Sequence, residues 1–135
     1  MKRLLQWFKK EAPHLRAGRR GEAQAKQFLK KAGLKIIASN VRVGYDELDL
    51  IAQQGDTLVF VEVKTRANEN FGRPIAAVNR AKRRKLSRAA MHFLKNRKLR
   101  PPHIRFDVVE VAGEKQEIRH IQNAFQLEGG YRIWW

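Results

Sequence analysis

Residues 58–66 read LVFVEVKTR, and this stretch decides the fold because it sets charged side chains into the most apolar run of the chain. Aromatic and β-branched residues predominate in it, which predicts a β-strand buried on at least one face. Because side chains alternate along a strand, Leu58, Phe60, Glu62 and Lys64 share one face, and three valines share the other. The strand therefore begins apolar on both faces and carries its charge at its end.

An acidic run, ELDLIA at residues 47–52, lies just upstream and alternates in the same way. The residues between the two runs contain Gly55-Asp56, the order of residues that a two-residue type II′ hairpin turn prefers. That turn would place Asp49 opposite Glu62 and Glu47 opposite Lys64. Opposed Cβ atoms are only about 4.5–5.5 Å apart, so two carboxylates there repel each other unless a proton or a metal ion lies between them.

Asp49 and Glu62 are therefore candidate metal ligands. Carboxylate oxygens around a cation that keeps some of its waters describe a Mg²⁺ site, and a lysine such as Lys64 beside it can orient or deprotonate an attacking water. The prediction depends on the hairpin register, because a slip of one residue would put the two acids on opposite faces of the sheet.

The composition is strongly basic, with 29 Lys and Arg against 13 Asp and Glu in 135 residues and a formal charge of +16. The length suits one domain, and the charge favours a polyanionic partner, with nucleic acid before an anionic membrane surface. The chain has no cysteine, which excludes disulfides and thiolate zinc sites. No apolar run approaches the ~20 residues of a membrane span, so we expect a cytoplasmic protein without stable membrane insertion.

The two ends of the chain differ in composition from the middle. Residues 1–17 are predicted to form a basic N-terminal arm, with a short amphipathic membrane contact through Trp7 and Phe8 as the alternative. Residues 18–125 form the expected domain. Residues 126–135 form an aromatic tail, in which Trp134 and Trp135 either cover an apolar patch or stack on bases.

A helical pattern begins at Gly18 and ends at Gly33, where a left-handed C-terminal cap belongs. Its apolar stripe has the spacing of one helix face and comprises Ala25, Phe28, Leu29 and Ala32. Glu22 shares this stripe. Its spacing fits two interpretations, a glutamate that only complements the helix dipole and a third acid leaning over the sheet toward Asp49 and Glu62.

A second helix should begin near Asn79. Its inward stripe is Leu86, Ala89, Ala90, Phe93 and Leu94. Six basic residues stand among nine at its start: Arg80, Lys82, Arg83, Arg84, Lys85 and Arg88. Such a run can be a solvated helix face, but Lys82 lies four residues before Leu86, on the inward stripe, which favours contact with phosphates. Together with Arg66, these six residues are the predicted nucleic-acid-binding set.

The remaining segments complete a mixed sheet. Residues 34–38 and 41–43, interrupted by Ser39-Asn40, form either one strand or a bent pair before the acidic strand, which predicts a meander. A mobile polar loop follows the charged strand at 67–74. Two further strands are expected at 104–112 and 117–121. Asp107 is either a fourth acid near the site or a partner for Arg105, the second being the safer interpretation, and Asp46 is expected to be a solvated turn residue.

Several of these stretches, taken in order and spacing, resemble the YraN-like bacterial proteins, whose fold is that of the restriction-endonuclease-like, PD-(D/E)xK nucleases. The matching pieces are GxxGExxA at 18–25, ELDLI at 47–51, VFVEVKTR at 59–66, FGxP at 71–74 with Lys82 and Leu86, RFDVV at 105–109, and NAF at 123–125. The resemblance spans about residues 18–125. One departure from the usual motif is Leu48, which stands where a proline commonly precedes the aspartate.

The resemblance implies an α/β fold, a mixed β-sheet flanked by α-helices. It also implies that Asp49 and Glu62 bind Mg²⁺ or Mn²⁺, that Lys64 is the catalytic lysine, and that Glu22 matches a helical glutamate of the Holliday-junction-resolvase-like branch. The expected function is a metal-dependent endonuclease acting on structured or branched DNA, and the alternative is a non-catalytic nucleic-acid-binding module. A homodimer would suit cleavage of both strands, although no interface is legible in the sequence.

Overall fold

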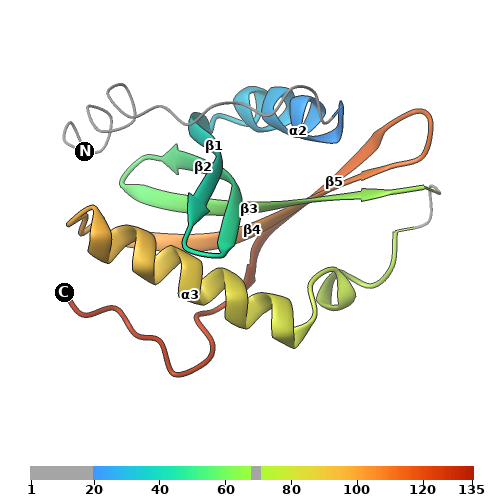
Figure 1. Ribbon diagram of the computed structural model, residues 1–135. Coiled ribbons are helices and arrows are strands. Elements are labelled where there is room, and N and C mark those ends of the chain that lie inside the picture. The colour runs from blue at the N-terminus through green and yellow to red at the C-terminus, as the bar shows by residue number, and fades with distance from the viewer. Residues whose placement is uncertain (1–19, 68–70) are drawn as a thin grey trace.

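A computed structural model describes residues 20–67 and 71–135 as one β-sheet between two helices (Figure 1). The elements in chain order are α2 (Arg20–Lys31), β1 (Lys35–Val43), β2 (Asp46–Gln54), β3 (Thr57–Arg66), the 3-10 helix η1 (Pro74–Ala76), α3 (Arg80–Asn96), β4 (His103–Ala112) and β5 (Glu117–Phe125). The five strands stand in chain order, antiparallel except for the parallel pair β3 and β4, which α3 connects. The predicted mixed sheet flanked by helices is confirmed.

The hairpin register predicted for β2 and β3 is also confirmed. Gln54 pairs with Thr57 across the turn, and the pairing continues regularly to Leu50 and Val61. Gly55 has a φ of +59°, a backbone conformation that glycine adopts without strain. The register follows from the turn, because a two-residue loop fixes which residues face each other.

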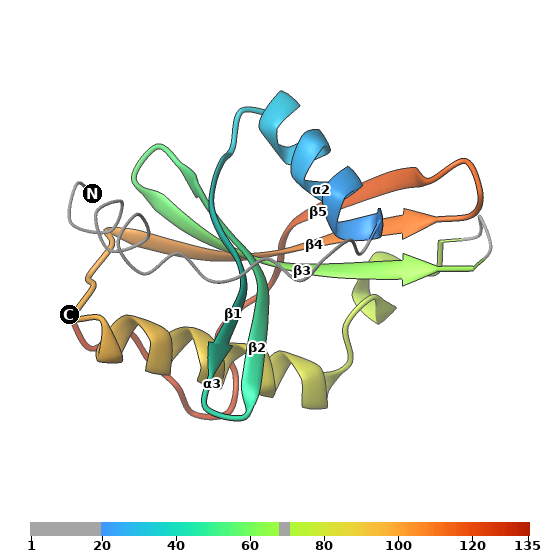
Figure 2. The ribbon, with the colours of Figure 1, turned by 45° about the horizontal axis from the view of Figure 1, so that its top comes forward.

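Each face of the sheet packs against one helix, as the turned view shows (Figure 2). On the α2 face, Ala25 and Leu29 pack with Val59 and Val61; on the α3 face, the inward stripe of the second helix packs with Phe60, Val108 and their neighbours. The strict alternation predicted for β2 fails at Leu48, which packs in the α3-side cluster and not with Leu50.

The helix ends follow the predicted capping. Asn79 accepts a hydrogen bond from the N–H of Lys82 at 2.9 Å, which starts α3. At the end of α2, Gly33 has a φ of +93°, and the N–H of Leu34 bonds back to Leu29, as in a Schellman cap. Ala32 was expected on the buried stripe but is exposed, because the helix has already ended at Lys31.

The ends of the described chain add two findings. The aromatic tail packs on the domain, since Tyr131 and Trp135 contact the α3-side core and the indole N–H of Trp135 donates to the Pro101 carbonyl at 2.8 Å. Trp134 is exposed. The predicted basic arm at 1–17 and residues 68–70 of the predicted loop lie outside the described residues, within which no helix is long and apolar enough to cross a membrane.

Candidate metal and nucleic-acid site

The two predicted metal ligands meet where the β2–β3 ladder stops. Regular pairing ends at Leu50 and Val61, one residue before Asp49 and Glu62. Beyond this point the Asp49 carboxylate replaces the strand backbone as acceptor, because the N–H of Val63 donates to Asp49 Oδ2 at 2.9 Å. The Glu62 carboxylate lies next to that of Asp49, close enough to raise its pKa. The acids are therefore neighbours on one face of the sheet.

Their proximity has a direct electrostatic consequence. Burial, and then the hydrogen bond and negative charge of Glu62, raise the pKa of Asp49 to about 7, while the Val63 N–H and the charge of Lys82 oppose the rise. Asp49 therefore loses its proton less readily than an isolated aspartate does. A cation next to its carboxylate would favour the ionised form.

Two lysines flank the pair from different elements. Lys82 of α3 places Nζ 3.1 Å from Glu62 Oε2, which confirms that this lysine lies on the inward side of the helix. Burial would lower the pKa of Lys82, but the charge and hydrogen bond of Glu62 outweigh it and raise the pKa. Lys64 shares the Glu62 face of β3, and its Nζ donates to the carbonyl of Ala77, just after η1, at 2.9 Å.

Glu22 is buried at the start of α2, as its place on the apolar stripe predicted. Its Oε2 accepts a hydrogen bond from Asn40 Nδ2 at 3.0 Å, and Asn40 has a φ of +53° within β1, a conformation that asparagine tolerates better than most residues. The pairing of Ser39 with Leu50 and of Val41 with Leu48 puts Asn40 beside Asp49. Glu22 therefore bonds a neighbour of the acid pair.

The start of α2 is held close to β3 by a glycine. A Cβ atom on Gly21 would lie 2.3 Å from Thr65 Cγ2, so only glycine allows this approach. The helix is thereby fixed next to the end of the strand that carries Glu62 and Lys64. Even so, within residues 20–67 and 71–135 no three His, Cys, Asp or Glu side chains are grouped so as to hold a metal ion. A catalytic role for Glu22 stays a prediction.

A second set of acids lies on β4, and sequence reasoning recognised only part of it. Asp107 is fully buried and accepts from Arg105 Nε at 2.8 Å, which confirms the pairing with Arg105. Burial raises the pKa of Asp107, but hydrogen bonds from His120, Arg105 and the Asn123 N–H outweigh burial and lower it. This acid belongs to an internal network and does not join the pair on β2 and β3.

Glu110 and Arg119 lie beside the site and form a charge network that sequence reasoning missed. Glu110 is fully buried, pairs with Lys64 in the β3–β4 ladder, and binds Arg66 Nε at 2.6 Å and Arg119 Nε at 2.7 Å. The Arg119 guanidinium lies over the ring of Phe71, 4.9 Å from its centroid. Arg66 and Arg119 remain partly exposed beside the site. The sequence did hold a signal for this position, because alternation along residues 104–112 places Glu110 on the same face of the strand as Phe106.

The six basic residues at the start of α3 have different surroundings. Arg83 binds Glu128, and Arg88 makes two hydrogen bonds to Asp46 in the turn of the β1–β2 hairpin. Asp46 was expected to be solvated, and that expectation was wrong, because the hairpin reaches α3 (Figure 1). The side chains with open exposure are those of Arg80, Lys82, Arg84 and Lys85. Their contact with phosphates stays a prediction.

The donor set at the carboxylate pair fits a hard divalent cation. Asp49 and Glu62 supply two neighbouring carboxylates, and the ammonium of Lys82 already lies against one of them as a positive charge would. Mg²⁺ is commonly held by one or two carboxylates while waters and substrate phosphates complete its ligands. The same chemistry suits Mn²⁺, which also prefers oxygen ligands.

Comparison with known proteins gives one consistent result. The model of the family described as Uncharacterised protein family UPF0102 matches residues 21–111, a range that contains Glu22, Asp49, Glu62 and Lys64. A UPF0102 protein of Symbiobacterium thermophilum is 50% identical over 113 residues, covering 82% of this chain and 96% of the relative. The UPF0102 protein of Desulfosudis oleivorans is 44% identical, over 80% of this chain and 88% of the relative. That of Caldicellulosiruptor saccharolyticus is 45% identical, over 80% of this chain and 95% of the relative.

Proposed function

The chain belongs to the protein family UPF0102, that of the YraN-like proteins, and on this premise we propose that it is a divalent-metal-dependent endonuclease acting on structured or branched DNA. The observation that carries the proposal is the position of the Asp49 and Glu62 carboxylates, which lie next to each other just beyond the last regular pair of the β2–β3 ladder. The pair lies beside two lysines, on a chain with a formal charge of +16.

In this proposal Asp49 and Glu62 hold Mg²⁺ or Mn²⁺. The ion, when bound, supplies positive charge that polarises the phosphoryl group and offsets the charge that develops during cleavage. The Val63 N–H fixes the Asp49 carboxylate, so the ligand is oriented before a substrate arrives.

Lys64 is the proposed catalytic lysine. Its bond to the Ala77 carbonyl engages one of the three ammonium donors and leaves the others to contact a phosphate oxygen or an attacking water. Lys82 would grip the same phosphate from the other side, because its Nζ already lies at Glu62. Arg66 and the exposed basic residues of α3 would hold neighbouring phosphates, which makes binding salt-dependent.

The experiment compares Asp49→Asn and Glu62→Gln with the unchanged chain in nicking assays on splayed-arm and four-way DNA. Both substitutions keep the shape of the side chain and remove its charge. We expect Mg²⁺- or Mn²⁺-dependent nicking to fall by about a hundredfold or more in each variant, while binding stays the same or tightens. Glu117→Gln is the matched control, since Glu117 is exposed on β5 and should leave the rate unchanged.

Two results would contradict the proposal. Nicking that persists in EDTA, or that is equal in all the variants, would come from a contaminating enzyme. No nicking of branched, single-stranded or RNA substrates with either metal would favour the second candidate, a non-catalytic nucleic-acid-binding module. The ion pair between Lys82 and Glu62 favours that candidate, because it balances one carboxylate without a metal ion. In such a module, Asp49→Ala should bind as well as the unchanged chain or better.

A further inference from the structure

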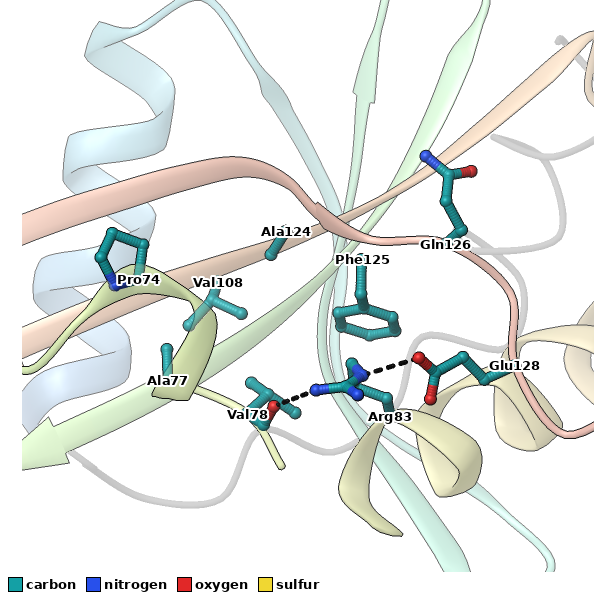
Figure 3. A pocket seen from close by; sticks show the side chains of 9 residues that line it. All are labelled: Pro74, Ala77, Val78, Arg83, Val108, Ala124, Phe125, Gln126 and Glu128. Atoms are coloured by element: carbon teal, nitrogen blue, oxygen red, sulfur yellow. Dashed lines mark hydrogen bonds and ion pairs between the residues drawn. The ribbon is translucent and has the colours of Figure 1, made fainter. Parts of the chain in front are cut away.

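A cavity of about 290 Å³ lies on the same face of the sheet as the carboxylate pair, beneath η1 and the start of α3 (Figure 3). The floor of the cavity and the walls next to it are apolar. They comprise Pro74, Ala77, Val78, Val108, Ala124 and Phe125. Two polar side chains, those of Arg83 and Glu128, lie together at the opposite side, while the side chain of Gln126 points away from them. Most of the apolar residues belong to the α3-side core, so the cavity is an opening in that core and not a crease between loops.

Two contacts place this cavity directly beside the proposed catalytic residues. Val108 on its floor pairs with Glu62 in the β3–β4 ladder, and paired strands lie only about 4.8 Å apart. The carbonyl of Ala77 on its wall accepts the hydrogen bond from Lys64 Nζ. The first turn of α3 contacts both the carboxylate pair and the cavity, since Lys82 binds Glu62 and the next residue, Arg83, lines the cavity.

The cavity has an origin in the sheet. Phe106 pairs with Phe125 and Val108 with Ile121, so residues 122–124 of β5 lie opposite Asp107 alone and form a bulge. The Asp107 carboxylate accepts the N–H of Asn123, whose φ is +50°, and thereby holds the bulge in place. Bulges re-aim side chains and are frequent next to functional sites. Here the bulge ends at Ala124 and Phe125, two residues of the cavity floor.

The polar side has an acceptor that the protein does not use. Arg83 donates to Glu128 Oε1 at 2.9 Å and to the Val78 carbonyl at 2.8 Å, as the dashed lines show (Figure 3). The other oxygen, Glu128 Oε2, is buried and accepts no hydrogen bond within the described residues. A buried acceptor left without a donor costs about 1–3 kcal/mol, so a shift of the Glu128 side chain that lets this oxygen accept an N–H from a group bound in the cavity would be favoured.

We propose that this cavity receives one unstacked nucleobase of the DNA strand that is bound at Asp49 and Glu62, with a preference for a base that carries an amino group. The inference rests on the proposed nucleic-acid function and extends it. The ring of Phe125 and the apolar floor suit the flat face of a base, and Glu128 suits an exocyclic amine of adenine, cytosine or guanine. The volume is just below the range of roughly 300–1000 Å³ usual for small-molecule pockets, enough for one base.

Such a cavity would select for branched DNA. Extruding a base from a duplex costs a few kcal/mol, and the cost is least for a base that is already unpaired. Nucleotides at a fork or junction have unpaired or weakly stacked bases. A strand that leaves a branch point could therefore place its phosphate at the carboxylates and a neighbouring base in the cavity without paying to open a duplex.

The test is a binding cycle that needs no cleavage. Splayed-arm DNA is made with a single abasic site at each of the six nucleotides beside the fork, and its dissociation constant is measured in EDTA. With the unchanged chain, one position should lose about tenfold in affinity, because stacking of one base on an aromatic ring is lost. With Ala124→Leu, which fills the cavity, the loss at that position should be less than about twofold.

Controls keep the outcome interpretable. Ala124→Val adds less volume to a half-buried strand position and should give an intermediate loss, so it serves if the leucine variant does not fold. Ala32→Leu makes the same change at an exposed position near the end of α2, and should behave as the unchanged chain. Thymine at the sensitive position should bind about fivefold more weakly than cytosine, because it has no exocyclic amine for Glu128.

The proposal is overturned if each abasic position lowers the DNA affinity of the unchanged chain and of both Ala124 variants by the same factor. Equal affinity for thymine and cytosine would overturn the amino-group preference. The cycle also separates this inference from the proposed activity: coupling between Ala124 and one nucleotide without nicking would keep the cavity and remove the endonuclease, whereas metal-dependent nicking without coupling would do the reverse.

Discussion

Two pairs of acids lie on the same sheet in opposite electrostatic surroundings. Asp107 and Glu110 of β4 are fully buried, and each is bound by basic side chains. Asp49 and Glu62, on β2 and β3, are half-buried and lie next to each other, with the Lys82 ammonium at Glu62. The acids of β4 are therefore paired with basic side chains inside the fold, while the charge of Glu62 acts against the ionised form of Asp49.

The difference in pKa follows from the donors. Burial raises the pKa of both aspartates, yet the pKa of Asp107 is lowered because His120 and Arg105 stabilise its charged form. The pKa of Asp49 is raised because Glu62, another acid, adds to the effect of burial, and the Val63 N–H and the charge of Lys82 do not outweigh the two. Burial alone therefore does not distinguish a structural acid from a functional one; the identity of the bonded partner does.

The largest expected effect tests whether the buried acids of β4 stabilise the fold. Glu110→Ala should lower the free energy of unfolding by about 3–5 kcal/mol, because Arg66 and Arg119 would lose the buried carboxylate that balances their charges. Urea denaturation followed by circular dichroism measures the change. Glu117→Ala, at an exposed site, is the control, and a loss below 1 kcal/mol for Glu110→Ala would remove the distinction between the two pairs.

The next effect concerns pH, where the two aspartates should act with opposite signs. A raised pKa means that the folded chain holds a proton that the unfolded chain has lost, so the Asp49 contribution to stability is present below its unfolded pKa of 3.8 and is lost as the pH rises toward 7. Asp107, with its lowered pKa, stabilises the fold above 3.8 and loses this contribution as the pH falls further.

The measurement for this pH effect is a difference between variants. Between pH 5 and 8 the unchanged chain should lose up to about 3 kcal/mol relative to Asp49→Asn, a bound set by the free energy per unit of pKa. Taking the difference cancels the contributions of groups that are the same in both chains. Added Mg²⁺ should restore stability at pH 8 in the unchanged chain alone. A parallel pH dependence of the two chains would show that Asp49 titrates normally.

A smaller effect tests the residue that joins the two regions. Gly21 packs on Thr65, which lies between Lys64 of the site and Arg66, the partner of Glu110. Gly21→Ala should cost about 1–3 kcal/mol through overpacking, partly offset by the better helix propensity of alanine. Thr65→Ser removes the methyl group in the way and should restore most of the loss in the double variant, which a thermal denaturation cycle measures. If the effects of Gly21→Ala and Thr65→Ser on stability simply add, the strain in Gly21→Ala does not come from contact with Thr65.

The smallest expected effect tests the ion pair between Lys82 and Glu62. Lys82→Gln should change the free energy of unfolding by less than about 1 kcal/mol, since its side chain is 46% exposed and the pair is screened by solvent. The pKa of Asp49 should rise further, because the charge of Lys82 lowers it. Side-chain NMR titration of Asp49 reads this shift. Lys95→Gln, exposed on the same helix, should leave the Asp49 pKa unchanged.

Much of the fold was predictable because its signals are local. The Gly55-Asp56 turn fixed the β2–β3 register, the apolar stripe of α3 gave its buried side, and Asn79 gave its start. Errors arose where a partner lies far along the chain. Asp46 was expected to be solvated because its ligand, Arg88, is 42 residues away. Glu110 was overlooked because Arg66 is 44 residues away.

The sequence by itself determined the strands, the helices and the nearness of Asp49 to Glu62, because a short hairpin turn leaves little freedom of register. Only the tertiary structure decided which charges neutralise which, and that Glu62, Val108 and Lys64 adjoin a cavity. Parallel pairing of β3 with β4 has no turn to fix it, and a bulge in β5 depends on a buried aspartate from another strand. Such contacts are set by packing across the whole sheet, which no local pattern records.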